Sequence, residues 1–165
     1  ELKKKLWMVL FWYPGSKKEG IAMLKNCSKN ASLTRIAAKL SLSDIYIQEK
    51  KPELSREIIS QLENQYENSR FMLWAKVKYL ESVKNYDSAA AVYERLSMNY
   101  AIIPEGKQNF FVTRNRMAHM LKLSGKDQNA AEICRSLLID QQLDQYRDIK
   151  KDTLKLLENL ENGKS

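Results

Sequence analysis

The sequence predicts an all-α fold made of antiparallel helical hairpins, and three observations lead to this prediction. Good helix formers (Leu, Lys, Glu, Gln, Ala and Met) dominate the 165 residues, which include only 5 Gly and 3 Pro. No segment alternates apolar and polar residues with the period of two that is typical of a strand. One apolar pattern also returns after 34 residues, with Tyr66 repeated as Tyr100 and Ser55 as Ala89. Such a period is typical of stacked helical hairpins, which bury their apolar faces against neighbouring units.

Capping residues and breakers mark the expected helix ends. Ser16 and Glu19 form an S-x-x-E capping box, and Pro52 suits the first turn of a helix. Gly125 ends a helix, and Gly163 stands where a left-handed C-terminal cap is expected. Further expected N-caps are Ser32, Ser69, Asn85 and Asp127. Together these signals predict helices over about 2–12, 16–28, 32–49, 52–66, 69–83, 85–100, 104–123, 127–139 and 143–162.

Small residues recur at one position of each unit, where the two helices of a hairpin are expected to cross. These residues are Gly20, Ser55, Ala89 and Ala130. A larger side chain there would push the two backbones apart. The spacing from Ala89 to Ala130 is 41 residues rather than 34, so we expect an insertion in the connection over 101–109. Large apolar residues separate the small ones, most clearly Leu73, Val77, Leu80, Tyr93 and Leu96.

Paired helices of this length and period resemble the tetratricopeptide repeat (TPR) family, and Asn85-Tyr86-Asp87 fits that family's turn between helices. The resemblance implies a right-handed superhelix of four hairpins, over about 1–34, 36–69, 70–103 and 107–141, with a C-terminal capping helix over 143–162. The chain departs from the family's pattern at two points. The proline that closes each unit is absent, and Met8 or Val77 replaces the first-helix glycine in two rows. A generic helical bundle is the alternative fold.

Charge is distributed unevenly along the chain. The net charge is +8, and residues 1–60 hold 12 Lys/Arg against 6 Asp/Glu. A basic end suggests an acidic partner, a nucleic acid backbone or an anionic membrane surface, and a solvated lysine-rich face is the simpler interpretation. The sequence lacks the RNP, Cys2His2 and basic-zipper patterns, which argues against nucleic acid. It also lacks an apolar run of the length that a membrane span needs.

The residues that could carry chemistry are few. His119 is the only histidine and has no cysteine near it at ligand spacing. No phosphate-binding glycine loop of a known type is present. Cys27 and Cys134 are far apart, each on an apolar helical face, and we expect two free buried thiols rather than a disulfide. We therefore predict no catalytic residue, no metal site and no cofactor in this chain.

Binding of a protein or peptide is the predicted function, because in TPR arrays the first helix of each pair lines the concave face. Carried onto this chain, that lining includes Val9, Asp44, Gln48 and Glu81. The residues expected to contact the partner are Trp12, Tyr13, Trp74, Lys78, Asn115, His119 and Lys122. Packing between neighbouring rows is the alternative role for Trp74. Val9 and Asp44 stand where the chaperone-tail version of this groove has polar or basic residues, so we do not predict that ligand.

The first expected helix is apolar all round over residues 6–13, which is typical of a helix buried on both sides. We expect it to pack against missing upstream sequence or against a second copy in a homodimer. The chain then represents part of a longer protein. Two alternative functions stay open, an electrostatic binder of nucleic acid or an anionic surface and an accessory domain of a larger enzyme. The sequence leaves the location unknown and is compatible with the cytoplasm or a bacterial periplasm.

Overall fold

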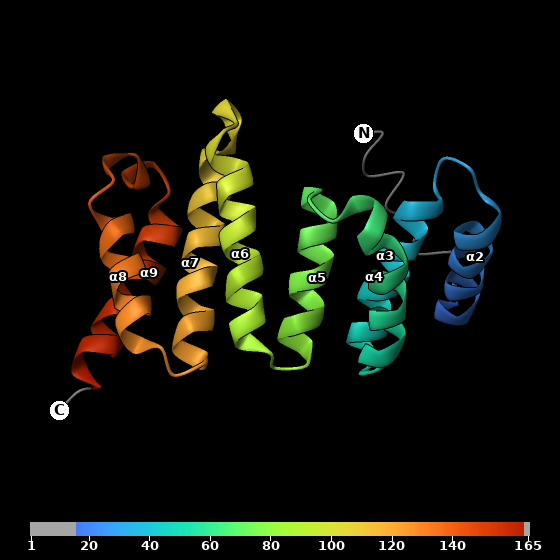
Figure 1. Cartoon of the computed structure of the whole chain (residues 1–165), viewed down its shortest axis with the longest axis horizontal. Helices are drawn as coiled ribbons and strands as arrows, with labels where there is room; N and C mark the ends of the chain where they lie inside the picture. Colours follow the sequence, from blue (N-terminus) through green and yellow to red (C-terminus); the bar gives the residue numbers. More distant parts are fainter. Residues whose placement is uncertain (1–15, 164–165) are drawn as a thin grey trace, which may run out of the picture.

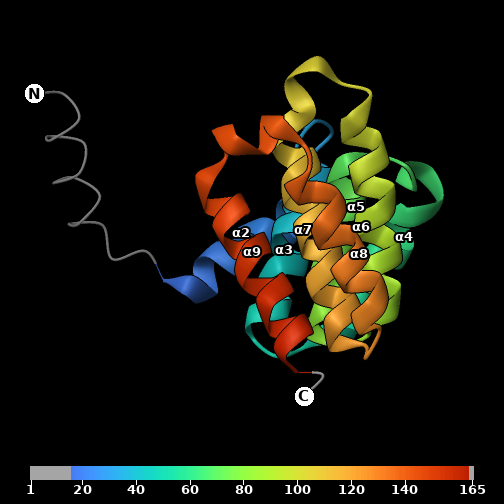
Figure 2. The same cartoon turned by 90° about the vertical axis from the view of Figure 1, so that its left-hand side faces the viewer.

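The computed structural model describes residues 16–163, and this part of the chain forms one row of helices with no strand (Figure 1). Each helix contacts the next one along the chain, so the row runs from α2 at one end to α9 at the other. Figure 2 views the row from the end formed by α8 and α9. The helices are α2 (Lys17–Asn30), α3 (Arg35–Gln48), α4 (Pro52–Tyr66), α5 (Arg70–Ser82), α6 (Tyr86–Ala101), α7 (Lys107–Leu123), α8 (Asp127–Leu138) and α9 (Arg147–Asn162). The predicted all-α fold is confirmed for these residues.

Several predicted helix ends are confirmed by their hydrogen bonds. The Ser16 side chain accepts a hydrogen bond from the Glu19 amide at 3.2 Å, which is the N-cap half of the predicted capping box. Asn85 caps α6 by accepting from the Ser88 amide, also at 3.2 Å. Pro52 is the first residue of α4, where its missing N–H leaves no hydrogen bond unmade.

Other helix ends differ from the prediction. The N-cap of α3 is Thr34 rather than Ser32, and the N-cap of α8 is Lys126 rather than Asp127. Gly163 has an ordinary negative φ of −75°, because its amide bonds to the Asn159 carbonyl and the last turn of α9 closes without a left-handed residue. The predicted left-handed cap at Gly163 is therefore wrong.

Two short 3-10 turns also shorten predicted helices. Pro104–Gly106 forms the turn η1 ahead of α7, and Gln141–Gln145 forms η2 ahead of α9. Leu143, the expected first residue of the last helix, lies in η2 and is fully buried. The η2 turn directs this side chain into an apolar cluster with Phe111 and Leu137, and α9 begins only at Arg147.

The turns inside three successive hairpins have the same backbone geometry. A residue with positive φ follows α3, α5 and α7, namely Lys50 (58°), Lys84 (58°) and Gly125 (77°). In each turn the next amide returns to the carbonyl five residues earlier, as in a Schellman motif: Lys51 to Tyr46, Asn85 to Leu80 and Lys126 to Leu121. The three positive-φ residues are separated by the same intervals as Ser55, Ala89 and Ala130 of the sequence repeat. The repeat in sequence is therefore also a repeat in backbone conformation.

The three hairpins also share one buried position on each helix. The two buried residues of a hairpin lie 12 positions apart, and both are fully buried in each case. The pairs are Ser43 and Ser55, Val77 and Ala89, and Ala118 and Ala130. In the α3–α4 hairpin the two serine hydroxyls are 2.7 Å apart and share a hydrogen bond, so neither is left unsatisfied. Gly20 is exposed, and the helix expected to cross it, over 2–12, lies outside the described residues.

The apolar core forms three clusters along the row. The largest runs through α5, α6, α7, α8 and α9, and a second joins α2, α3, α4 and α5. The third surrounds Phe111. No helix among residues 16–163 is both long and apolar enough to cross a membrane.

Cys134 is expected to react far more slowly than Cys27 with a thiol reagent such as Ellman's reagent at about pH 8. Both thiols are free, as predicted, in helices that lie far apart in the row, but only Cys134 is fully buried (Figure 1). Burial, and secondarily the Asp152 carboxylate, raise the pKa of Cys134 from 9.0 to about 11, so the reactive thiolate is scarce in the folded protein.

The raised pKa also gives a pH dependence. The Cys134 thiol favours folding below about pH 9, and this contribution is lost as the pH rises through 11. The expected Ellman's time course has one fast thiol, which disappears in Cys27→Ser, and one thiol that reacts only when the chain opens. Two fast thiols in the native protein would contradict the burial of Cys134.

Candidate ligand-binding groove

A groove with a volume of about 400 Å³ lies between α3 and α5, the first helices of two successive hairpins. Asp44 and Gln48 come from α3 at i, i+4 spacing, which places them on one face of that helix. Lys78 and Glu81 come from the facing side of α5. Ile47 and Ser82 complete the lining. Four of these six residues are among those that the resemblance assigned to the concave face.

An ion pair spans this groove. Lys78 Nζ lies 2.6 Å from Asp44 Oδ2, and the two residues are one repeat, 34 positions, apart. Both side chains keep more than a third of their surface exposed, at 51% and 37%. Ion pairs exposed to this extent contribute only about 0.2–1 kcal/mol, so a ligand group can replace either partner at little cost.

Glu81 is fixed from the other side by the second helix of its own hairpin. Its carboxylate accepts a hydrogen bond of 2.7 Å from the Tyr93 hydroxyl of α6. Burial, and then this hydrogen bond, raise the pKa of Tyr93 well above its ordinary value, so the phenol remains a donor. Glu81 therefore offers the groove a carboxylate in a defined position.

Trp74 belongs to the packing between helices rather than to the groove. Its indole nitrogen donates a hydrogen bond of 3.0 Å to the Tyr100 hydroxyl. Its ring makes an edge-to-face contact with the Tyr93 ring, with ring centres 5.9 Å apart. These contacts join α5 to α6 within one hairpin, in the largest apolar cluster, rather than two neighbouring rows as the alternative role had it.

Two of the three candidate residues on α7 contact α9. Asn115 is buried, at 6% exposure, and its amide donates a hydrogen bond of 2.9 Å to Thr153 of α9. His119 Nε2 lies 2.8 Å from the Asp152 carboxylate of the same helix. Lys122 is partly exposed. The expectation that Asn115 lines an open face is corrected, because α9 packs over that face of α7. Trp12 and Tyr13 lie outside the described residues.

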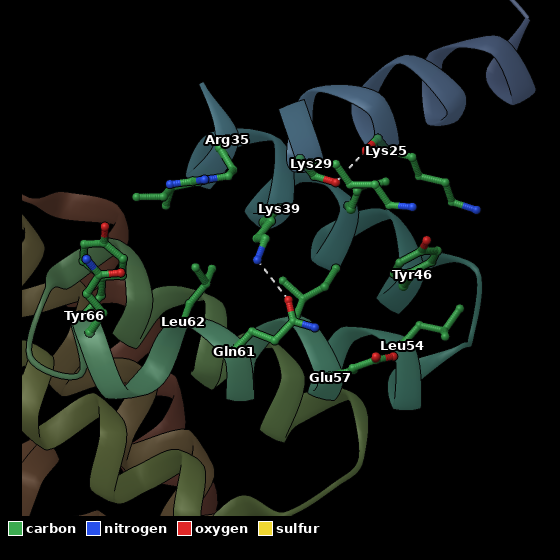
Figure 3. Close-up of a pocket in the computed structure, with 15 residues that line it drawn as sticks. Lys25, Lys29, Arg35, Lys39, Tyr46, Leu54, Glu57, Gln61, Leu62 and Tyr66 are labelled. Atoms are coloured by element: carbon green, nitrogen blue, oxygen red, sulfur yellow. Dashed lines mark hydrogen bonds between the residues drawn. The ribbon is translucent and has the colours of Figure 1, made fainter. Parts of the chain in front are cut away.

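A second, larger cavity of about 730 Å³ lies between α2, α3 and α4, and sequence reasoning did not name its lining (Figure 3). The excess of Lys and Arg over residues 1–60 was the available signal. That signal could not locate the cavity, because it lies where three helices meet.

Among residues 16–163, no three His, Cys, Asp or Glu side chains come together as possible metal ligands. A scan against protein-family models, a search of curated proteins and a search of solved structures each found no match to the chain. The resemblance to the TPR family therefore stays a prediction from the sequence.

Proposed function

We propose that this chain is a non-catalytic interaction module, a TPR-like right-handed superhelix that binds a peptide or partner protein on the face formed by its first helices. The groove between α3 and α5 supports the proposal. The observation that carries it is the exposed Asp44–Lys78 pair, which joins two successive first helices without being buried. Exposed polar groups held on rigid helices are well suited to contact a partner.

The groove's chemistry suits an extended peptide. Lys78 can bind a carboxylate, whereas Asp44 and Glu81 can accept hydrogen bonds from a basic side chain or from peptide amides. The Gln48 amide both donates and accepts, so it can bond to the main chain of a ligand. A ligand with both a positive and a negative group would replace the Asp44–Lys78 ion pair by two ion pairs between protein and ligand.

Selection of peptides from a random display library on the immobilised chain tests the proposal. We expect the best peptide to lose about tenfold in affinity in Lys78→Ala, and a similar amount in Gln48→Ala. Lys78 is exposed, so Lys78→Ala should leave the urea midpoint nearly unchanged and the loss should reflect binding alone. Lys151→Ala is the matched control, because Lys151 is an exposed lysine on α9, far along the row from the groove (Figure 1).

Equal affinity for the wild type, Lys78→Ala and Gln48→Ala would show that the selected peptide binds elsewhere. If no peptide is enriched and short oligonucleotides bind instead with a steep salt dependence, the electrostatic alternative replaces this proposal.

A further inference from the structure

The cavity between α2, α3 and α4 carries an unusual excess of positive charge. Lys25 and Lys29 reach it from α2, and Arg35 and Lys39 from α3, whereas Glu57 is the one carboxylate in its lining (Figure 3). Among residues 16–163, no carboxylate lies within ion-pair distance of any of these four cations. Most of the positive charge at this cavity is thus available to a ligand.

The opposite wall of the cavity is formed by α4, which contributes three aliphatic side chains beside the polar Glu57, Gln61 and Gln65. Leu54, Ile58 and Leu62 follow one another at i, i+4 and i+8 along one face of this helix. Ile58 and Leu62 are buried by the neighbouring helices, whereas Leu54 is 40% exposed. Lys39 donates a hydrogen bond of 2.9 Å to the Gln61 side chain across the cavity, which holds one cation beside this wall (Figure 3).

This cavity and the α3–α5 groove use opposite faces of α3. Arg35, Lys39 and Leu42 follow the i, i+4, i+7 spacing of one face, and they line the cavity. Asp44 and Gln48 form another face, roughly half a turn away, and line the groove. The two surfaces are therefore separate, and neither depends on the other being occupied.

We propose that this cavity is a second binding site, which takes an acidic segment of a partner protein that carries aliphatic side chains. Carboxylates of the segment would pair with Lys25, Lys29 and Arg35, and one or two Leu or Ile side chains would cover Leu54 and the edges of its neighbours on α4. Single-stranded nucleic acid fits less well, because its bases stack on free aromatic faces. The two tyrosines of the lining, Tyr46 and Tyr66, are partly buried and packed against the apolar cluster of α2, α3, α4 and α5. The proposal goes beyond the α3–α5 groove and holds independently of it.

Fluorescence polarisation with a synthetic peptide tests this site. The probe is a labelled peptide of about 12 residues with Leu at i, i+3, i+4 and i+7 and Glu at the remaining positions. We expect Lys25→Glu with Lys29→Glu to weaken binding by about tenfold or more, because two attractive contacts become repulsive. Lys151→Glu with Lys155→Glu on α9 makes the same change in net charge at exposed positions far along the row, and should retain most of the affinity.

Two further probes separate the contributions to binding. Replacing every Leu of the peptide by Ser should also weaken binding about tenfold if these leucines contact the aliphatic side chains of α4. Lys78→Ala should leave the affinity for this acidic peptide unchanged, so a failure of this proposal is distinguishable from a failure of the α3–α5 groove. Lys25 and Lys29 are exposed, and an unchanged urea midpoint would show that their double variant still folds.

Three results would overturn the proposal. The first is absence of measurable binding by the acidic peptide. The second is an equal loss of affinity in the two double variants, which would indicate attraction to net charge alone. The third is tighter binding of a single-stranded oligonucleotide or of phosphatidylserine vesicles through the same lysines, which would assign the cavity to a different class of ligand.

Discussion

Ala89→Leu is expected to lower the free energy of unfolding by about 1–3 kcal/mol, or more if the helices cannot separate. Ala89 is fully buried in α6, within the cluster that packs this helix against α5. Val77, the paired position on α5, is also fully buried, so there is no free space to receive three additional carbon atoms. A leucine must either push the two helices apart or adopt a strained rotamer. Urea denaturation followed by circular dichroism measures the change.

Ala91→Leu is the matched control for this substitution. Ala91 lies two residues further along α6 and is exposed, so its leucine would extend into solvent and should change stability by only about 0.5 kcal/mol. A loss of stability in Ala91→Leu as large as in Ala89→Leu would point to a general effect on α6. An Ala89→Leu protein that unfolds like the wild type would show that the hairpin register assigned to this helix is wrong.

Phe111→Ala is expected to cost about 3–5 kcal/mol of unfolding free energy. The Phe111 ring on α7 is fully buried, and the ring centres of Phe110 and Tyr146 lie 5.5 Å from its own. Leu137 and Leu143 belong to the same cluster, so this one side chain joins α7 to α8 and to the η2 turn. Removing it leaves a cavity at the point where the C-terminal part of the chain turns back.

Phe71→Ala provides the control, with the same chemical change at a phenylalanine that is 42% exposed. Phe71 keeps a tilted contact with the Tyr66 ring, so a smaller loss of about 1 kcal/mol is expected. In thermal and urea unfolding, Phe111→Ala should be much less stable than Phe71→Ala. The reverse order would contradict the burial of Phe111 behind the η2 turn.

Among residues 16–163, the sequence was sufficient to predict each of the eight helices to within a few residues and the buried crossing residues of three hairpins. Ser55, Ala89 and Ala130 are all fully buried, because apolar spacing and side-chain size determine which helix face turns inward. The left-handed turn residues were harder to predict. A glycine such as Gly125 indicates a left-handed turn residue, because it adopts positive φ readily. Lys50 and Lys84 also adopt positive φ, although their side chains normally disfavour it. Packing of the paired helices overrides this local preference.

The candidate site was predicted only in part, and α9 explains most of the difference. The facing positions on α3 and α5 follow from the repeat, so Asp44 and Lys78 could be placed on one groove. On α7 the corresponding position is His119, and both His119 and Asn115, one turn earlier, contact α9. α9 thus covers the face of α7 that corresponds to the groove, an effect that depends on contacts between residues far apart in sequence. The packing role of Trp74 could be recognised only from the structure, through its hydrogen bond to Tyr100 on α6.

The most direct test of binding at the α3–α5 groove is an NMR titration of the isotopically labelled chain with the best peptide selected on it. We expect the amide shifts to change most around Asp44, Gln48, Lys78 and Glu81, with little change on the exposed face of α9, and we expect Lys78→Ala to suppress the response. Shift changes confined to other helices, or an undiminished response in Lys78→Ala, would contradict the assignment of this groove as the ligand-binding surface.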